Sequence, residues 1–258
     1  MIDLVLQGVI DQYAIEIAEH YSNLDFIDNI ICSGWVSDPS VIIDNSRIKL
    51  IRSPLLQNPG IGNRNRQIVT SLEGLKQVNT EFTAKLRSDQ KISLDSMKLM
   101  YDYYEKNKER KLQYWDDKNK PYNRICVAGI FKPIPFHPRD HMFWGNTKDL
   151  LEVFNIPLDP LVQLPHTDYE KTVRSEAYIC QYYYAKFDNI IYNYIVNPHE
   201  YLVDNAPKIA EAFITSDKLI TDVFLPFPKV DFEWPKYGMS NYHYHYTETV
   251  YGEYWGPI

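Results

Sequence analysis

Two short segments carry charged side chains where a diphosphate could bind. The first, Asn63-Arg64-Asn65-Arg66-Gln67, opens a predicted helix after a stretch rich in Pro, Gly and Asn. The second, Arg87-Ser88-Asp89, ends a predicted strand one helix later. Arginine forks and free backbone N–H groups at a helix start bind phosphate oxygens, and a carboxylate at a strand end could hold a divalent metal. A solvated arginine pair and an Asp that caps a turn are the equally open alternative.

Short apolar runs and helical patterns alternate through the first hundred residues. They predict strands at 4–6, 26–32, 48–51 and 82–86, with helices at 13–21 and 67–78. Such alternation is typical of an α/β fold with a mostly parallel, doubly wound, Rossmann-like sheet. Ligands bind at the carboxyl ends of the strands in these sheets. Those ends fall at Gln7-Gly8, Ser33-Gly34-Trp35 and Ser88-Asp89.

The second half of the chain has a different pattern. Helices are expected at 95–111, 147–154 and 174–186, and a strand at 125–131. The tail from Val223 is rich in Pro, Tyr and Trp, and we expect it to wrap over the domain as irregular structure. Without a repeat or a flexible linker, the whole chain, 1–258, is expected to form a single domain.

Composition excludes several classes of protein. The chain has 258 residues with 27 Lys+Arg against 34 Asp+Glu, a net charge of −7, which argues against a nucleic-acid binder. Three scattered cysteines form no CxxC pair, so buried thiols in a reducing compartment are expected. No basic leader and no apolar run of about 20 residues is present. We therefore expect a cytoplasmic protein without a transmembrane segment.

Several motifs resemble those of the WavE-type lipopolysaccharide-synthesis proteins, a group regarded as glycosyltransferases. The resemblance runs from about residue 4 to about residue 185. It implies a GT-A fold, a nucleotide-sugar donor, with UDP-sugars favoured, and transfer to a saccharide acceptor. Residues 1–95 would then form the donor half, and 96–258 the acceptor half and tail. The motifs that carry it are Leu4–Gly8, Gly60-x-Gly62-Asn63-x-Asn65-Arg66-Gln67-Ile68, Ser71-Leu72-x-Gly74-Leu75, Lys85–Asp89, Pro135-Phe136-His137-x-x-Asp140 and Phe143-x-Gly145.

The resemblance also implies a donor site. GT-A enzymes usually place Asp-x-Asp at the end of the fourth strand. Asp89 fits the final acid, whereas Arg87 replaces the first, which leaves open whether Mn²⁺ or Mg²⁺ is required. The implied donor-binding residues are Gln7, Gly8, Trp35, Asn63, Arg66, Arg87, Ser88 and Asp89.

Two carboxylates are candidates for the catalytic base. Glu176 stands in the first turn of a predicted helix, where inverting GT-A enzymes often carry this group. The alternative role is an interaction with the helix dipole. Asp140 is the rival base, or it binds acceptor hydroxyls.

Metal binding has further candidates at the C-terminal end. GT-A enzymes often take a metal or diphosphate ligand from a C-terminal His. His243 and His245, which would share one face of a strand, are therefore candidate metal ligands with Asp89, although packing is an equally simple role. His137, His141 and His166 are as readily structural.

The leading hypothesis is therefore an inverting glycosyltransferase acting in surface-glycan or lipopolysaccharide-type synthesis. Arg87 favours an alternative, a non-catalytic nucleotide-sugar- or saccharide-binding protein with a degraded GT-A site. A nucleotide-sugar hydrolase is a third hypothesis.

Overall fold

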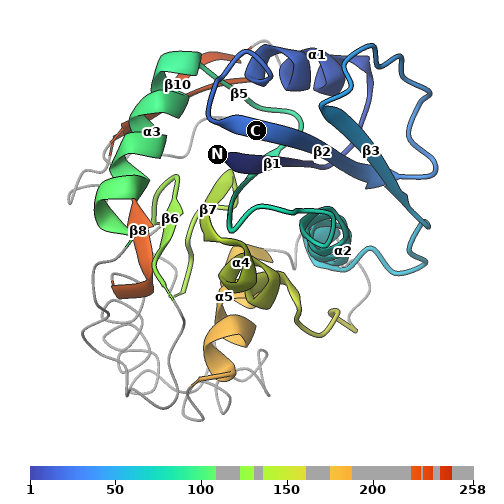
Figure 1. The fold of residues 1–258 in the computed structure, drawn as a ribbon. Coiled ribbons are helices and arrows are strands. Elements are labelled where there is room, and N and C mark those ends of the chain that lie inside the picture. Colours follow the sequence, from blue (N-terminus) through green and yellow to red (C-terminus); the bar gives the residue numbers. More distant parts are fainter. Residues whose placement is uncertain are drawn as a thin grey trace.

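A seven-stranded mixed sheet forms the centre of the molecule in the computed structural model (Figure 1). The structure describes residues 1–108, 123–130, 136–160, 175–187, 222–227, 229–234 and 239–245. The strand order is β3-β2-β1-β4-β7-β6-β8. These strands are β1 (Ile2–Gln7), β2 (Ile27–Trp35), β3 (Ile48–Ser53), β4 (Phe82–Arg87), β6 (Ile125–Val127), β7 (Met142–Asn146) and β8 (Phe224–Pro226).

The four N-terminal strands run parallel to one another. Leu6 of β1 pairs with Cys32 on one side and with Leu86 on the other, so the carboxyl ends of β1, β2 and β4 lie at the same edge of the sheet. β7 is antiparallel to both β4 and β6, and β8 pairs in parallel with β6. The α/β class with a mostly parallel central sheet is thus confirmed.

Helices cover both faces of this sheet because side chains alternate along its buried strands. Leu4 and Leu6 belong to the core under α1 (Gln12–Tyr21) and α3 (Leu94–Asn107). Val5, between them, belongs to the opposite core. That core lies under α2 (Arg64–Leu75), α4 (Thr147–Phe154) and α5 (Ser175–Ala185), and Figure 1 shows the two groups of helices on opposite sides. The short helix η1 (Ile61–Asn63) precedes α2.

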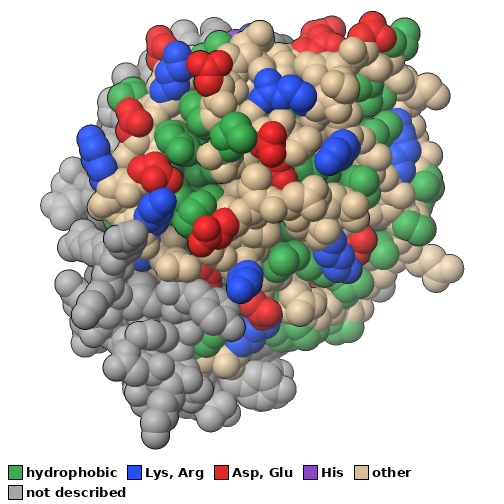
Figure 2. All heavy atoms as spheres, in the orientation of Figure 1, with side chains coloured by type: hydrophobic (Ala, Val, Ile, Leu, Met, Phe, Trp, Pro, Cys, Tyr) green, Lys and Arg blue, Asp and Glu red, His purple; other side chains and the backbone are tan. Residues whose placement is uncertain are grey.

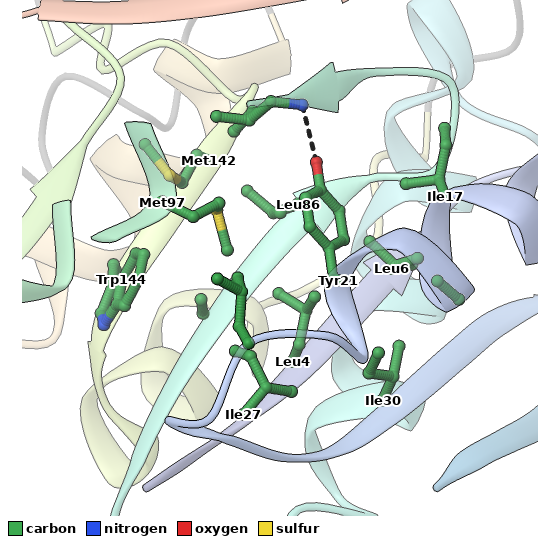
Figure 3. Packing of buried hydrophobic residues seen from close by; sticks show 14 of the residues in the cluster. Leu4, Leu6, Ile17, Tyr21, Ile27, Ile30, Leu86, Met97, Met142 and Trp144 are labelled. Carbon is green, nitrogen blue, oxygen red and sulfur yellow. Dashed lines mark hydrogen bonds between the residues drawn. The ribbon is translucent and has the colours of Figure 1, made fainter. Parts of the chain in front are cut away.

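The first core contains one polar link that bears on the site. The Tyr21 hydroxyl at the end of α1 accepts a 2.7 Å hydrogen bond from the backbone N–H of Ile92 (Figure 3). Ile92 belongs to β5 (Lys91–Ile92), which begins directly after Asp89 and Gln90. Leu86 packs in the same cluster, where each fully buried aliphatic side chain contributes about 1.5–3 kcal/mol. The segment that contains Asp89 is therefore anchored before it by Leu86 in this core and after it by the Ile92–Tyr21 hydrogen bond.

The expected elements are confirmed with adjusted ends. The second strand was expected to end at residue 32 with a turn at 33–35, but β2 continues through Ser33-Gly34-Trp35, because these residues pair with residues 51–53 of β3. α2 begins at Arg64, and β6 ends at Val127. Cys32, Cys126 and Cys180 are buried free thiols, as expected. None of the helices in the described residues is long and apolar enough to cross a membrane.

For the described residues of the tail, the expectation of irregular structure is wrong; the rest of the tail lies outside the described residues. β8 joins the central sheet, and β9 (Lys229–Trp234) pairs with β10 (Met239–His245) and with β5 in a second sheet. The alternation of Val230, Phe232 and Trp234 with acidic residues already has the period of a strand. The surrounding prolines and aromatic residues obscured it.

Candidate functional site

A close contact joins β1 and β4 at the carboxyl edge of the sheet. Ser88 donates its backbone N–H to the Gln7 carbonyl at 2.9 Å and its hydroxyl to the Val9 carbonyl at 2.8 Å. Gly8 has a φ of 143°, and a Cβ there would lie 2.4 Å from Ser88 Oγ. Only glycine fits both the backbone angle and the space. This contact places Arg87 and Asp89 beside the end of β1.

The end of β2 is braced by Asp38. Its Oδ2 accepts from the backbone N–H groups of Ile10, at 3.0 Å, and of Trp35, at 2.8 Å. Trp35 is 5% exposed, so it is the backbone and not an open ring face that lies at this edge. A donor-binding role for Trp35 stays a prediction.

Arg87 connects two carboxylates that are far apart in the sequence. Its Nε and Nη2 donate to the two oxygens of Asp89 at 3.0 and 2.8 Å, and its Nη1 lies 3.3 Å from Asp140 Oδ2. Gln67 of α2 donates to the same Asp140 oxygen at 3.1 Å. We call these four residues the Arg87 cluster. The structure thus brings together two predicted donor-site residues and one predicted base.

Charges around the cluster shift the pKa values of Asp140 and His141. Burial opposes ionisation of Asp140, but Arg87, His141 and Lys85 outweigh it and lower the pKa of Asp140 to about 2. Burial lowers the pKa of His141 to about 4, against the opposing charge of Asp140. His141 Nδ1 lies 2.6 Å from Gln90 Nε2. At neutral pH, Asp140 is therefore a weak proton acceptor and His141 is uncharged.

A lysine lies beneath the cluster. Lys85 of β4 is fully buried and donates to the backbone carbonyl of Asp140 at 3.2 Å. Its ammonium also lies 5.7 Å from the ring centroid of Phe143 and 5.5 Å from that of Phe154. Burial lowers the pKa of Lys85 to about 8, although the charges of Asp140, Glu176 and Asp89 act in the opposite direction. Lys85 is still protonated at neutral pH.

Glu176 reaches the same region from α5. Its Oε2 lies 3.6 Å from His137 Nε2, and its side chain keeps 21% of its surface exposed. The negative charge of Glu176 favours the protonated form of Lys85. The helix α5 covers the same core as α2, which carries Gln67 of the Arg87 cluster. Glu176 and Asp140, the two predicted bases, are therefore associated with the same face of the sheet.

The two arginines at the start of α2 have different surroundings. Arg64 is buried against Asp159, with Nη1 2.6 Å from Oδ2, and its guanidinium lies 4.4 Å from the centroid of the Tyr178 ring. Arg66 remains partly exposed, and its Nη1 donates to Asn63 Oδ1 at 3.3 Å. Asn63, at a φ of 61°, does not cap α2 with its side chain. The expectation that both arginines offer phosphate donors is wrong for Arg64, because Asp159 occupies it.

The candidate metal ligands do not form a centre within the described residues. Both Asp89 oxygens accept from Arg87, and no group of three or more His, Cys, Asp or Glu side chains suited to a metal ion occurs in the described part of the chain. His243 and His245 lie on β10, separated from β5 by β9. Their side chains lie outside the described residues, as does all of His166. The metal ion therefore stays a prediction.

Lys85 and Gln67 had no predicted role, and the role of His137 was left open between site and structure. Lys85 carried one usable signal, because a lysine inside an apolar run of a central parallel strand must be buried. Gln67 and His137 carried none, since their partners, Asp140 and Glu176, are distant in the chain.

The face of the molecule shown in Figure 2 gives no sign of a polyanion-binding surface among its described residues. On the side shown in Figure 2, Lys and Arg side chains alternate with Asp and Glu side chains and form no basic patch. This agrees with the net charge of −7.

Several solved structures show weak similarity to the chain. The 4-diphosphocytidyl-2C-methyl-D-erythritol synthase from Anaerococcus prevotii is 11% identical, with a TM-score of 0.36, over 59% of this chain and 74% of that chain. S. aureus TarS 1-349 is 12% identical, with a TM-score of 0.37, over 86% and 80%. Its complex with UDP-GlcNAc is 12% identical, with a TM-score of 0.35, over 86% and 82%. Similarity this low does not carry the ligands of those proteins over to this chain.

Family assignment comes from the sequence. No curated protein matches the chain. The family model described as WavE lipopolysaccharide synthesis matches residues 29–199, which is more than half of the chain and includes Arg66, Arg87, Asp89, Asp140 and Glu176. The chain therefore belongs to the WavE lipopolysaccharide synthesis family.

Proposed function

We propose that the protein is a glycosyltransferase of lipopolysaccharide-type glycan synthesis that acts in the cytoplasm. It transfers a sugar from a nucleoside-diphosphate donor, with UDP-sugars as the first candidates, to a saccharide acceptor. Family membership supports the pathway. The observation that carries the reaction class is Arg87, held between Asp89 and Asp140 at the carboxyl edge of the sheet, where α/β folds bind ligands.

Donor binding follows from the groups at this edge. Arg87 is 36% exposed, and Arg66 lies at the start of α2, where the helix dipole favours an anion. Both would donate to the diphosphate, which carries extra negative charge as it leaves. Stabilising that charge in the transition state accelerates transfer.

Glu176 is the base that we propose for the acceptor hydroxyl. Asp140 is held by Arg87 and Gln67 with a low pKa, which makes it a poor proton acceptor at neutral pH. Glu176 lies on a different element and is partly exposed. Deprotonation of the hydroxyl by Glu176 and attack on the anomeric carbon form a single displacement with inversion.

Binding and turnover together test this function. Thermal shift with UDP-, GDP-, CMP- and TDP-sugars should show stabilisation by one nucleotide class, since a ligand that binds the native state raises stability. Asp89→Asn should nearly abolish turnover of that donor while the fold survives. Asp102→Asn, on the exposed surface of α3, is the matched control. No stabilisation across the panel would contradict the function.

A non-catalytic binding protein is the second candidate. It is favoured by Arg87, which occupies both oxygens of the aspartate that would otherwise hold a metal. Glu176→Gln separates the two functions: an enzyme keeps donor binding and loses transfer, whereas a binding protein has no transfer to lose.

A further inference from the structure

We propose that Arg87 does the work of a divalent cation at the diphosphate, so that donor binding by this protein needs no metal ion. This inference rests on the proposed function and concerns the same site. It explains why an arginine stands where the resemblance implies the first acid of Asp-x-Asp.

Arg87 is held in place by its acceptors and still has donors to offer. Two bonds to Asp89 and one to Asp140 fix the guanidinium plane. A guanidinium has more N–H donors than these three bonds use, and the side chain is 36% exposed. A planar, permanently charged fork with free N–H groups suits phosphate oxygens.

The charges around Arg87 match those of a metal centre. Arg87 and Lys85 supply two positive charges, and Asp89 and Asp140 supply two negative charges. A divalent cation between two carboxylates has the same net charge of zero. Lys85 is fully buried, so it acts through its field and its bond to the Asp140 carbonyl, whereas Arg87 reaches the ligand.

A metal ion at Asp89 would have to share both carboxylate oxygens with Arg87. Both Asp89 oxygens accept from Arg87, at 3.0 and 2.8 Å. A cation brought there would also lie beside the Arg87 charge, and like charges repel. The residues present at Asp89 therefore fit an arginine-bound diphosphate better than a metal-bound one.

The first experiment measures UDP binding to the full chain by calorimetry and thermal shift, with EDTA, with Mn²⁺ and with Mg²⁺. We expect dissociation constants that agree within about twofold in the three buffers. Binding that appears only with a metal would overturn the inference and leave the function standing. If neither UDP nor any other nucleoside diphosphate binds in any of the three buffers, the proposed function is contradicted, and the inference with it.

The second experiment restores a conventional acidic pair. Arg87→Asp places a carboxylate two residues before Asp89. In EDTA we expect the variant to bind UDP at least about tenfold more weakly than wild type, with Mn²⁺ recovering much of the loss. Lys76→Met, at the far end of α2, is the control for the loss of one positive charge. Unchanged binding by Arg87→Asp in EDTA would overturn the proposal. The wild-type comparison stands even if this variant does not fold.

Discussion

Arg64 and Arg87 both pair with aspartates that are distant in the sequence, but their surroundings differ. Arg64 and Asp159 leave only 3% and 2% of their side chains exposed, and a tyrosine ring covers the guanidinium. Arg87 is 36% exposed and contacts two aspartates. The first pair connects α2 to the segment after α4, whereas the second lies open at the sheet edge.

This difference separates a structural ion pair from a binding group. Arg64 is almost completely buried and pairs with Asp159, so its guanidinium is not accessible to a ligand from solvent. Arg87 keeps N–H donors and surface while its position is fixed. Substitutions at the two sites should therefore act on different quantities, stability for the first and ligand affinity for the second.

Arg64→Met should have the largest effect on stability. It leaves the Asp159 carboxylate buried without the Arg64 guanidinium, and breaking a buried ion pair in this way typically costs about 3–5 kcal/mol. Urea denaturation at pH 7 measures the loss. The double variant Arg64→Met/Asp159→Leu should recover most of it, because neither charge of this pair remains. A loss below about 1 kcal/mol for the single variant would contradict the structural role.

Acid should destabilise the protein through His141 beside the Arg87 cluster. Its pKa is about 4 in the folded state against about 6.5 when unfolded, so the unfolded chain takes up the proton first as the pH falls. About 3 kcal/mol of the unfolding free energy should be lost between pH 6.5 and pH 4. Asp140, with a pKa of about 2, stays ionised across this range. Urea titrations at several pH values measure the slope, which His141→Gln should flatten; parallel curves would refute the assignment.

Arg87→Met should change stability little and binding much. The side chain is more than one third exposed, so we expect about 1 kcal/mol in the free energy of unfolding. UDP affinity should fall at least about tenfold, equivalent to about 1.4 kcal/mol, as measured by calorimetry. The distinction between the two arginines would be contradicted if Arg87→Met lost as much unfolding free energy as Arg64→Met and kept its UDP affinity.

Lys76→Met should have the smallest effect. Lys76 pairs with Glu73 on the solvent side of α2, with side chains 50% and 38% exposed. Removing this pair should cost less than about 0.5 kcal/mol and leave UDP affinity unchanged. Denaturation and calorimetry under the same conditions provide the baseline for the other variants.

The sequence predicted the sheet well because its signals are local. Leu4, Ile48 and Phe82 lie in apolar runs bounded by turns, and such runs form strands wherever helices separate them. The sequence indicated that Gly8 and Ser88 follow strands that end at the same edge of the sheet, but it did not predict the contact between them. The tail strands were missed because their alternation was short and surrounded by prolines.

The roles of the charged residues depend on partners that local patterns do not reveal. Arg64 and Arg66 look alike in the sequence, and Asp159, 95 residues later, is what separates them. Arg87 likewise meets Asp140 across 53 residues. Which arginine is buried and which remains open is decided by tertiary packing alone.

The position of β8 has a consequence for synthesis on the ribosome. β6 pairs with β7 on one side and with Phe224–Pro226 on the other. Until residue 226 has emerged, the outer edge of β6 has no partner from β8, while β1 to β4 are already complete. Unpaired edges recruit other chains. The edge of β6 therefore stays unpaired until late in translation, long after β1, β2 and β4 have emerged.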